Sequence, residues 1–467
     1  MFRVFPQRSS STHFVELFAD GMLCFVAALL AAITLGQPTL NAASIVQVLT
    51  PSILLTALAF ALVMALLYSF VGLYRHRNLG LLPLMLRVSL VFVVGGYITY
   101  LATKHVAADH GSELVIYALL YLTAGLTLYR GTAWAVRQAV GIRRVIIIGT
   151  GHDAQQVLAD MRAGGQWSGY EVAGFFPTTE QCADPVGDSS APIFNRTQRL
   201  IDLVREHKVN DIIVAVREQR GGGVPMDQLL DCRISGVPVM DLAGFYERTK
   251  AEVPVDSLKA SWLVYNNGFE QSHARQLSKR MFDIVTSGLL LVMTSPLMLL
   301  TAIAIKLDSR GPVFYTQERT GLAGKSFKCI KFRSMRTDAE KDGVARWATK
   351  NDSRITRVGS FIRKTRIDEL PQLLSVLAGE MSMVGPRPER PSFVAQLREQ
   401  IPFYDLRHTV KPGLTGWAQV RYAYGASLED ARRKHQFDLY YIKNNSLLLD
   451  LLVLIETVSV VLFREGV

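Results

Sequence analysis

Residues 281–306 read MFDIVTSGLLLVMTSPLMLLTAIAIK, an apolar stretch that a Ser295-Pro296 pair interrupts near its middle. A helix of about 20 apolar residues is long enough to cross a bilayer, so this stretch meets the length requirement. Lys279 and Arg280 precede the stretch, and Lys306 ends it. Because basic flanks stay on the cytoplasmic side of a membrane, both ends are expected on that side. The sequence therefore predicts a re-entrant helix at 281–306 that enters the membrane and returns.

The Ser295-Pro296 pair supplies the bend that such a helix needs. Proline removes one intrahelical hydrogen bond and disfavours helical geometry at the residue before it. The alternative is an ordinary transmembrane helix with a proline kink. Within a bilayer, neighbouring groups can hydrogen-bond to the backbone groups that the proline leaves free. The charge of the flanks favours re-entry, and the alternative stays open.

The composition indicates a membrane protein with two or three domains. The chain has 467 residues, of which 49% are hydrophobic, and a formal net charge of +11; its mean hydropathy is +0.20. Four further apolar stretches, 14–35, 51–73, 81–101 and 114–129, each approach the length of a spanning helix. They predict a four-helix transmembrane anchor within residues 1–142. Basic residues before the first stretch and after the second and fourth place both ends of this anchor in the cytoplasm.

Several protein classes are disfavoured by the remaining composition. The four cysteines are scattered without a CxxC pair, which argues against a structural zinc site or a disulfide framework. The positive charge suits the anionic inner leaflet of a membrane. No stacking or zinc motif accompanies the basic residues, so nucleic acid is not an expected partner.

A Rossmann-like α/β domain is expected at 143–245. Strand-like runs at 144–148, 171–176, 211–216 and 237–242 alternate with helical patterns, which predicts a parallel doubly wound sheet. Residues 246–276 have mixed polarity and are expected to form a connector. The turn Gly149-Thr-Gly151-His-Asp-Ala154 resembles the phosphate-binding GxGxxA motif, but no acidic residue follows the second strand to hold a ribose. Nucleotide binding and a tight turn without a ligand both remain open.

The C-terminal domain, 277–467, carries the residues suited to phosphate chemistry. Five basic residues in 354–366 come just before the carboxylate pair Asp368-Glu369. Ionised carboxylates beside guanidinium groups can attack phosphorus or bind a metal; alternatively, Asp368 is the N-cap of the next helix. Two loops rich in proline and glycine present Arg387 and Lys411. Such rigid loops suit ligand binding, although solvated surface loops are the alternative. The apolar tail 447–463 is expected to form an interfacial or packed helix.

The order of several motifs in this domain resembles that of a known family. The motifs are Lys279-Arg280, Phe282-Asp283, Ser295-Pro296, the run from Gly311 to Arg319, Lys331-Phe332-Arg333-Ser334-Met335, Asp368-Glu369-Leu370-Pro371-Gln372, Gly385-Pro386-Arg387-Pro388 and the run from Lys411 to Gly416. Together they are similar to the motif series of the bacterial sugar transferases, the monotopic polyprenyl-phosphate phosphoglycosyl transferases. The upstream anchor and α/β domain resemble those of the large members, such as the undecaprenyl-phosphate glucose or galactose phosphotransferases.

This resemblance implies a reaction and a set of site residues. The family transfers sugar-1-phosphate from a UDP-sugar to a polyprenyl phosphate and releases UMP, which starts exopolysaccharide assembly. By resemblance, Asp368 is the nucleophile that forms a phosphosugar-aspartyl intermediate, Glu369 assists it, and both are candidate ligands of Mg²⁺. Asp438 is a further acidic candidate, with a helix-surface acid near Lys443 as the alternative. The candidate phosphate-binding residues are Lys331, Arg333, Arg363, Arg366, Arg387 and Lys411.

The resemblance also implies a location. The protein is expected in the bacterial inner membrane, with its catalytic C-terminal domain on the cytoplasmic face. A membrane-anchored nucleotide sensor or assembly scaffold is the alternative function, and a glycosyltransferase that releases UDP is another. The sequence leaves open which hexose is transferred, what the α/β domain binds, and whether the chain forms a homo-oligomer.

Overall fold

The computed structural model describes residues 10–36, 50–71, 81–103, 111–140, 143–162, 170–178, 191–216, 223–258, 263, 268–269, 272–339, 352, 354–422, 425 and 427–463. The chain forms two compact units, which meet in sequence between Lys250 and Ala251. The first unit contains a helical bundle and an α/β domain, and the second contains the carboxylate pair.

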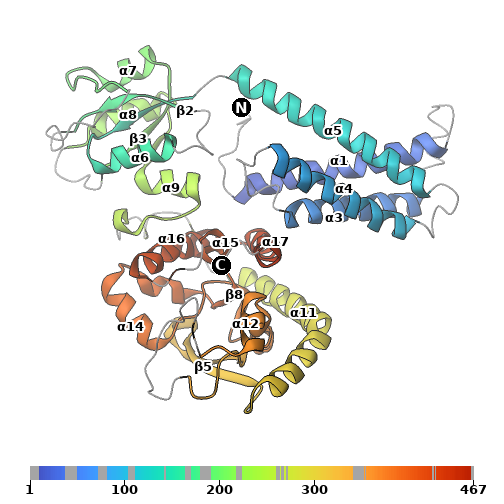
Figure 1. Ribbon diagram of the computed structural model, residues 1–467. Coiled ribbons are helices and arrows are strands. Elements are labelled where there is room, and N and C mark those ends of the chain that lie inside the picture. Colours follow the sequence, from blue (N-terminus) through green and yellow to red (C-terminus); the bar gives the residue numbers. More distant parts are fainter. Residues whose placement is uncertain are drawn as a thin grey trace. The chain divides into compact units, whose positions relative to one another are not determined.

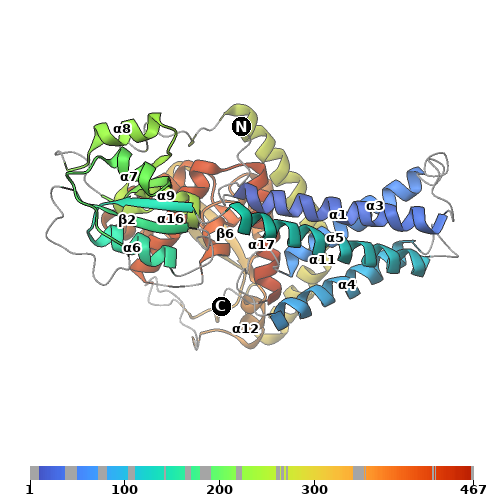
Figure 2. The same ribbon diagram turned by 90° about the horizontal axis from the view of Figure 1, so that it is seen from above.

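Four long helices form the bundle at the start of the first unit. They are α1 (Ser10–Gly36), α3 (Pro51–Phe70), α4 (Leu81–Thr103) and α5 (Gly111–Val140). Figure 2 shows them lying side by side. Alanines of α1 pack against larger side chains such as Phe60 and Met64, so the helices approach closely. Outward-facing side chains such as Leu55 and Val93 are apolar and exposed, as in helices that face lipid.

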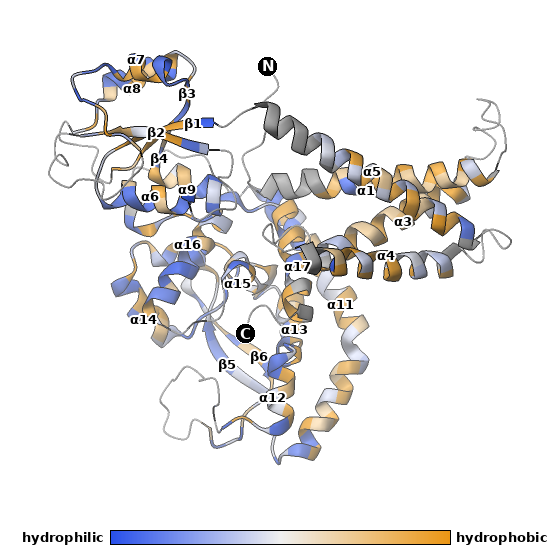
Figure 3. Ribbon diagram, turned by 45° about the horizontal axis from the view of Figure 1, so that its top comes forward, coloured by the Kyte–Doolittle hydropathy of each residue, from blue (hydrophilic) through white to orange (hydrophobic). Residues whose placement is uncertain are grey.

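Three helices of the described chain are long and apolar enough to cross a membrane. They are α1, α3 and α11 (His273–Asp308), whereas α4 and α5 contain shorter apolar stretches. Figure 3 shows the apolar colour along these helices. These helices support the prediction of a membrane protein. The N-terminal arginines, Arg3 and Arg8, and most of the loops used to orient the anchor lie outside the described residues.

The α/β domain has the predicted parallel sheet. The strands β1 (Arg143–Ile148), β2 (Tyr170–Phe176), β3 (Val209–Val214) and β4 (Val239–Asp241) are arranged in the order β2-β1-β3-β4. Successive side chains of a strand point to opposite faces. Val145 and Ile147 accordingly pack with α6 (His152–Arg162) and α9 (Leu242–Lys250), while Ile146 and Ile148 pack with α7 (Leu200–Glu206) and α8 (Met226–Ile234).

Two details of this domain bear on the sequence-based expectations. Helix α9 continues to Lys250, and Phe245 and Tyr246 lie in its core, so the domain extends past residue 245. Gly149 has a φ of +109°, and its N–H donates to the Phe176 carbonyl at 2.8 Å. This bond continues the pairing of β1 with β2 into the turn, and it decides neither for nucleotide binding nor for a turn without a ligand.

The second unit surrounds two small sheets with helices. The helix α11 is followed by the antiparallel pair β5 (Phe314–Thr320) and β6 (Ser326–Phe332), then α12 (Arg357–Lys364), α13 (Gln372–Ala378) and the parallel pair β7 (Ser382–Val384) and β8 (Gly413–Thr415). Further helices of the described residues are α14 (Pro391–Gln400), α15 (Trp417–Arg421), α16 (Leu428–Asn444) and α17 (Leu447–Phe463). Short 3₁₀ turns occur at Val255–Ser257, Leu322–Gly324, Ile367–Glu369 and Tyr404–Thr409.

Helix α11 contains Pro296 and is helical throughout, yet Figure 1 shows its axis curving into an arc. Near its beginning, Asp283 accepts hydrogen bonds from Ser382 Oγ and Met383 N at 3.0 Å each. At its other end, Arg333 donates to the Ser309 carbonyl at 2.7 Å. Both ends are therefore held by the same unit, while most of the helix between them is apolar and exposed.

The first residues of this unit, Ala251 to Val253, and its last helix, α17, both pack against the rest of the unit. Ala251 accepts a hydrogen bond from Trp417 Nε1 at 2.9 Å, and Val253 N donates to the Gln436 carbonyl at 3.0 Å. The unit thus includes residues that the sequence placed in the connector. In α17, Asp450 is buried and ion-paired to Lys279 at 2.7 Å, so one face of this apolar helix is packed.

Candidate functional site

The carboxylate pair lies in a 3₁₀ turn, Ile367–Glu369, between α12 and α13. Arg366 adopts a left-handed conformation with a φ of +59°, which reverses the chain just before the pair. Asp368 and Glu369 are both buried. Pro371 is the N-cap of α13 and no side chain caps the helix, so the N-cap alternative for Asp368 is wrong.

Glu369 is the centre of a cluster of cations from three separate segments. Its Oε1 accepts from Lys331 Nζ of β6 at 2.9 Å and from Arg387 at 2.6 Å. The Arg366 guanidinium lies 3.9 Å from the same oxygen. Burial alone would raise the pKa of Glu369, but Arg387 and Lys331 outweigh it and hold the pKa well below its usual range. Glu369 is therefore ionised and fully engaged at neutral pH.

Asp368 is the less engaged member of the pair. Among the described residues, its Oδ1 is buried and has no hydrogen-bond partner. Burial, followed by the adjacent charge of Glu369, raises the pKa of Asp368 to about 6, although Lys331 and Arg363 oppose the shift. A buried carboxylate oxygen without a partner is costly, and a bound ion or water or a catalytic role is among its explanations.

The loop that carries Arg387 is fixed by close backbone packing. It follows β7, whose parallel partner β8 lies in the second loop predicted from sequence. Gly385 N donates to the Thr415 carbonyl at 2.9 Å, and a β-carbon on Gly385 would lie only 2.4 Å from the Lys411 carbonyl oxygen. The glycines therefore allow the two loops to touch, and the rigid pair of loops positions Arg387.

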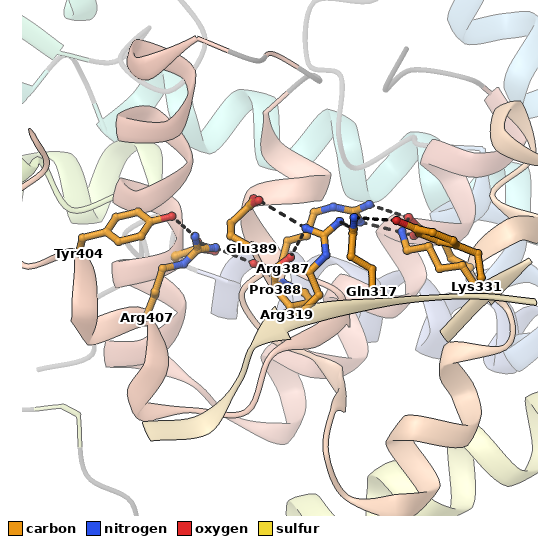
Figure 4. A network of polar contacts seen from close by, with 11 residues as sticks. Gln317, Arg319, Lys331, Arg387, Pro388, Glu389, Tyr404 and Arg407 are labelled. Carbon is orange, nitrogen blue, oxygen red and sulfur yellow. Dashed lines mark hydrogen bonds and ion pairs between the residues drawn. The ribbon is translucent and has the colours of Figure 1, made fainter. Parts of the chain in front are cut away.

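A buried arginine, Arg407, holds the backbone of Arg387. Arg407 donates to the Arg387 carbonyl at 2.8 Å and to Asp438 Oδ2 at 3.1 Å, and it also contacts the Tyr404 hydroxyl. Figure 4 shows this network extending from Tyr404 through Arg407 to the Arg387 loop and on to Lys331. Asp438 is buried in α16, so the interpretation as a helix-surface acid is wrong. Asp438 contacts Arg407, which holds the backbone of Arg387.

A second arginine, on the antiparallel pair β5 and β6, holds the same loop. Arg319 of β5 donates to the Pro388 carbonyl at 3.1 Å and to Gln317 Oε1 at 2.6 Å, and lies 3.7 Å from Glu389. Neither Arg319 nor Arg407 was among the candidates from sequence. Arg319 belongs to a motif that the resemblance included, whereas nothing local to Arg407 indicated its role.

The remaining candidate residues lie in different places. Arg363 is close enough to Asp368 to lower its pKa. Arg333 instead donates to the backbone carbonyls of Ser309 and Arg310 at the end of α11. Lys411 lies near Arg280 at the start of α11, and Ser295 Oγ donates to the Val292 carbonyl at 2.8 Å within the helix. The structure thus brings together Lys331, Arg363, Arg366 and Arg387 around the carboxylates.

The donor set for a metal is small. No group of three or more candidate ligands was found among the described residues. The unpartnered Oδ1 of Asp368 fits a hard cation, and Mg²⁺ commonly takes one or two carboxylates together with substrate phosphates. Asp368 therefore fits Mg²⁺ when a phosphate substrate supplies further oxygens, whereas both oxygens of Glu369 already accept from Lys331 or Arg387.

A buried carboxylate pair among lysine and arginine, on a unit with a long apolar helix, defines a membrane-associated protein with a site for phosphate chemistry. The model of the family described as bacterial sugar transferase matches residues 274–464. A UDP-glucose:undecaprenyl-phosphate glucose-1-phosphate transferase of Xanthomonas campestris pv. campestris is 32% identical over 429 residues, which cover 87% of each chain. The chain belongs to the bacterial sugar transferase family.

Other relatives agree with this membership. A UDP-N-acetylgalactosamine-undecaprenyl-phosphate N-acetylgalactosaminephosphotransferase of Aeromonas hydrophila is 40% identical, over 64% of this chain and 71% of the relative. A UDP-glucose:undecaprenyl-phosphate glucose-1-phosphate transferase of Escherichia coli (strain K12) is 35% identical, over 75% of this chain and 76% of the relative. A second family model, described as a CoA-binding domain, matches residues 55–222 and includes much of the α/β domain.

Proposed function

We propose that this protein transfers a sugar-1-phosphate from a UDP-sugar to undecaprenyl phosphate, releases UMP, and so starts the assembly of a polysaccharide. Family membership and the names of the relatives support this reaction. The observation that carries the chemistry is the difference between the two carboxylates. Asp368 has an unpartnered oxygen, whereas Glu369 is held by Lys331 and Arg387. A nucleophile needs a free lone pair, so Asp368 is the nucleophile.

The reaction proceeds in two displacements. An Asp368 oxygen attacks the β-phosphorus of the UDP-sugar, the bond between that phosphorus and the bridging oxygen breaks, and UMP leaves with the bridging oxygen. An oxygen of undecaprenyl phosphate then attacks the same phosphorus and releases the Asp368 carboxylate. Lys331, Arg366 and Arg387 neutralise the phosphate oxygens in a site shielded from water, where such contacts are strong. Asp368 and the substrate phosphates would hold Mg²⁺, which would supply further charge neutralisation when bound.

The membrane arrangement follows from α11. The attachment of both ends of this helix to one unit, through Ser382, Met383 and Arg333, supports a re-entrant helix with Pro296 at its bend. Helices α1, α3, α4 and α5 form the transmembrane anchor. The catalytic unit, residues 251–467, lies at the cytoplasmic face, where a soluble UDP-sugar and a membrane-held phosphate both reach Asp368.

A UMP exchange assay tests the proposal. A covalent intermediate predicts that the purified protein in detergent exchanges labelled UMP into the UDP-sugar when no lipid acceptor is present. Asp368→Asn should abolish this exchange, and Gly288→Ala, where nothing lies within 4 Å of the added methyl group, provides a control for expression. The relatives' names contain two different sugars, so the donor panel includes UDP-glucose, UDP-galactose and the N-acetylated UDP-hexosamines. Release of UDP in place of UMP, or full exchange by Asp368→Asn protein, would refute the mechanism.

A further inference from the structure

Lys411 is a half-buried cation that the carboxylate site does not use. It precedes Pro412 in the loop before β8. Within the part of the chain that the structure describes, its ammonium group has neither a hydrogen-bond acceptor nor a carboxylate within ion-pair distance. Burial, followed by the nearby Arg280, lowers the pKa of Lys411. An anion at this position would relieve both costs.

Arg280 provides a second cation at the same place. Its guanidinium caps α13 by donating to the Val376 and Leu377 carbonyls at 2.7 and 2.6 Å. A β-carbon on Gly379, at the end of α13, would lie 3.5 Å from Arg280 Cζ and 3.6 Å from Lys411 Nζ. The two charges are therefore within about 7 Å of each other, close enough to repel where water is scarce.

The nearby carboxylates are already used. Asp283 accepts from Ser382 Oγ and Met383 N, and Asp450 pairs with Lys279 at 2.7 Å. Two carboxylates, Asp283 and Asp450, therefore face the three cations Lys279, Arg280 and Lys411, which leaves one positive charge in excess. Guanidinium groups have five N–H donors, so Arg280 retains donors beyond its two bonds to α13.

The surroundings of this pair are apolar on the side of the membrane helix. Leu277 and Ile284, one turn before and after Arg280 on the same helix face, are both exposed. From here α11 continues into its long apolar stretch. Cations at the start of an apolar membrane segment lie at the depth of lipid phosphates.

The pair is also separate from the reacting carboxylates. Helix α13 has seven residues and is about 10 Å long; Asp368 precedes it, whereas Gly379 ends it. A phosphate between Arg280 and Lys411 would therefore not lie within reach of Asp368. We infer that Lys411 and Arg280 form a second anion site, which binds the phosphate group of a membrane lipid. This inference rests on the membrane placement in the proposed function and not on its chemistry.

Thermal unfolding of the full chain in detergent tests the site. Short-chain phosphatidylglycerol should raise the unfolding temperature of the wild type more than phosphatidylcholine does. Lys411→Met should bind the anionic lipid about tenfold more weakly, as expected for the loss of one charge-assisted hydrogen bond. Lys411→Arg should retain binding. Lys306→Met removes an exposed cation at the other end of α11 and should also retain it.

Farnesyl phosphate provides the second arm of the experiment. If it stabilises the wild type in a Lys411-dependent manner and phosphatidylglycerol does not, Lys411 belongs to the acceptor site and a separate lipid site is refuted. If neither lipid shows dependence on Lys411, the site does not exist. Asp368→Asn should lose UMP exchange and keep the lipid-dependent stabilisation, so failure of the proposed reaction is distinguished from failure of this site.

Discussion

Arg387 and Glu369 face each other as a forked ion pair: one guanidinium nitrogen lies 2.6 Å from Oε1 and the other lies 3.4 Å from Oε2. Arg387 is therefore held in place before any substrate arrives, with Glu369 as its counter-ion. A diphosphate that binds here would compete with Glu369 for the same guanidinium. The planar fork suits phosphate as well as carboxylate, which a lysine does not reproduce.

Substitution of Arg387 should therefore lower transfer strongly. We expect Arg387→Ala to reduce kcat/KM for the UDP-sugar by about 100- to 1000-fold, the usual cost of losing one preorganised group that stabilises charge. Arg387→Lys should recover only part of this loss. UMP release at several donor concentrations measures the effect, and wild-type kcat/KM in Arg387→Ala protein would place the diphosphate elsewhere.

The pH dependence of the first displacement should report Asp368. Its pKa is raised to about 6 by burial and by Glu369, so the nucleophile is ionised above this pH and protonated below it. The kcat/KM for UMP formation should be flat above about pH 6 and should fall about tenfold per unit below it. Glu369, with its lowered pKa, does not titrate in this range. If kcat/KM began to fall only near pH 4, Asp368 would instead be an ordinary, solvated aspartate.

Asp438 should act through Arg407. Asp438→Asn leaves Arg407 buried without its counter-ion, which should cost about 3–5 kcal/mol of stability. The double variant Arg407→Met/Asp438→Leu should recover part of this stability. It should remain weakly active, because the hydrogen bond from Arg407 to the Arg387 carbonyl is lost. Thermal unfolding measures the effect on stability, and UMP release measures the effect on activity. If the stability losses of Arg407→Met and Asp438→Leu alone added up to the loss of the double variant, the ion pair would contribute nothing.

The contact between the two glycine loops should tolerate no side chain. Gly385→Ala places a methyl group 2.4 Å from the Lys411 carbonyl oxygen, so the loops must move apart at a cost of about 1–3 kcal/mol or more. Gly288→Ala in α11 is the matched control, because nothing lies within 4 Å of the added group. The unfolding temperature should fall for the first variant alone.

Cysteine labelling should find both ends of α11 on one side of the membrane. Gln276→Cys and Arg310→Cys, in a chain without its native cysteines, should be blocked by the same impermeant reagent from the same side. Asn41→Cys, in the first loop expected outside, marks the opposite side. If the two α11 positions were accessible from opposite sides, the helix would span the membrane and re-entry would be wrong.

Local patterns were sufficient for much of this protein. The length of the apolar runs predicted α1, α3 and α11, and the runs of branched residues predicted the parallel strands of the α/β domain. The helix expected after Asp368-Glu369 was also confirmed as α13. These features depend on the periodicity and backbone preferences of a few neighbouring residues, which a sequence displays directly.

Which residues form the site depends on contacts between residues that are far apart in the sequence. All six candidate cations look equivalent in the sequence, yet Lys331 and Arg387 reach Glu369, Arg333 holds the end of α11, and Lys411 lies beside Arg280. The pairing of Arg407 with Asp438 joins positions 31 residues apart. By itself, the sequence determined the apolar helices, the strands of the α/β domain and the carboxylate pair, because local physics governs them. Only the tertiary structure decided which charges meet, because that depends on how the loops and strands pack.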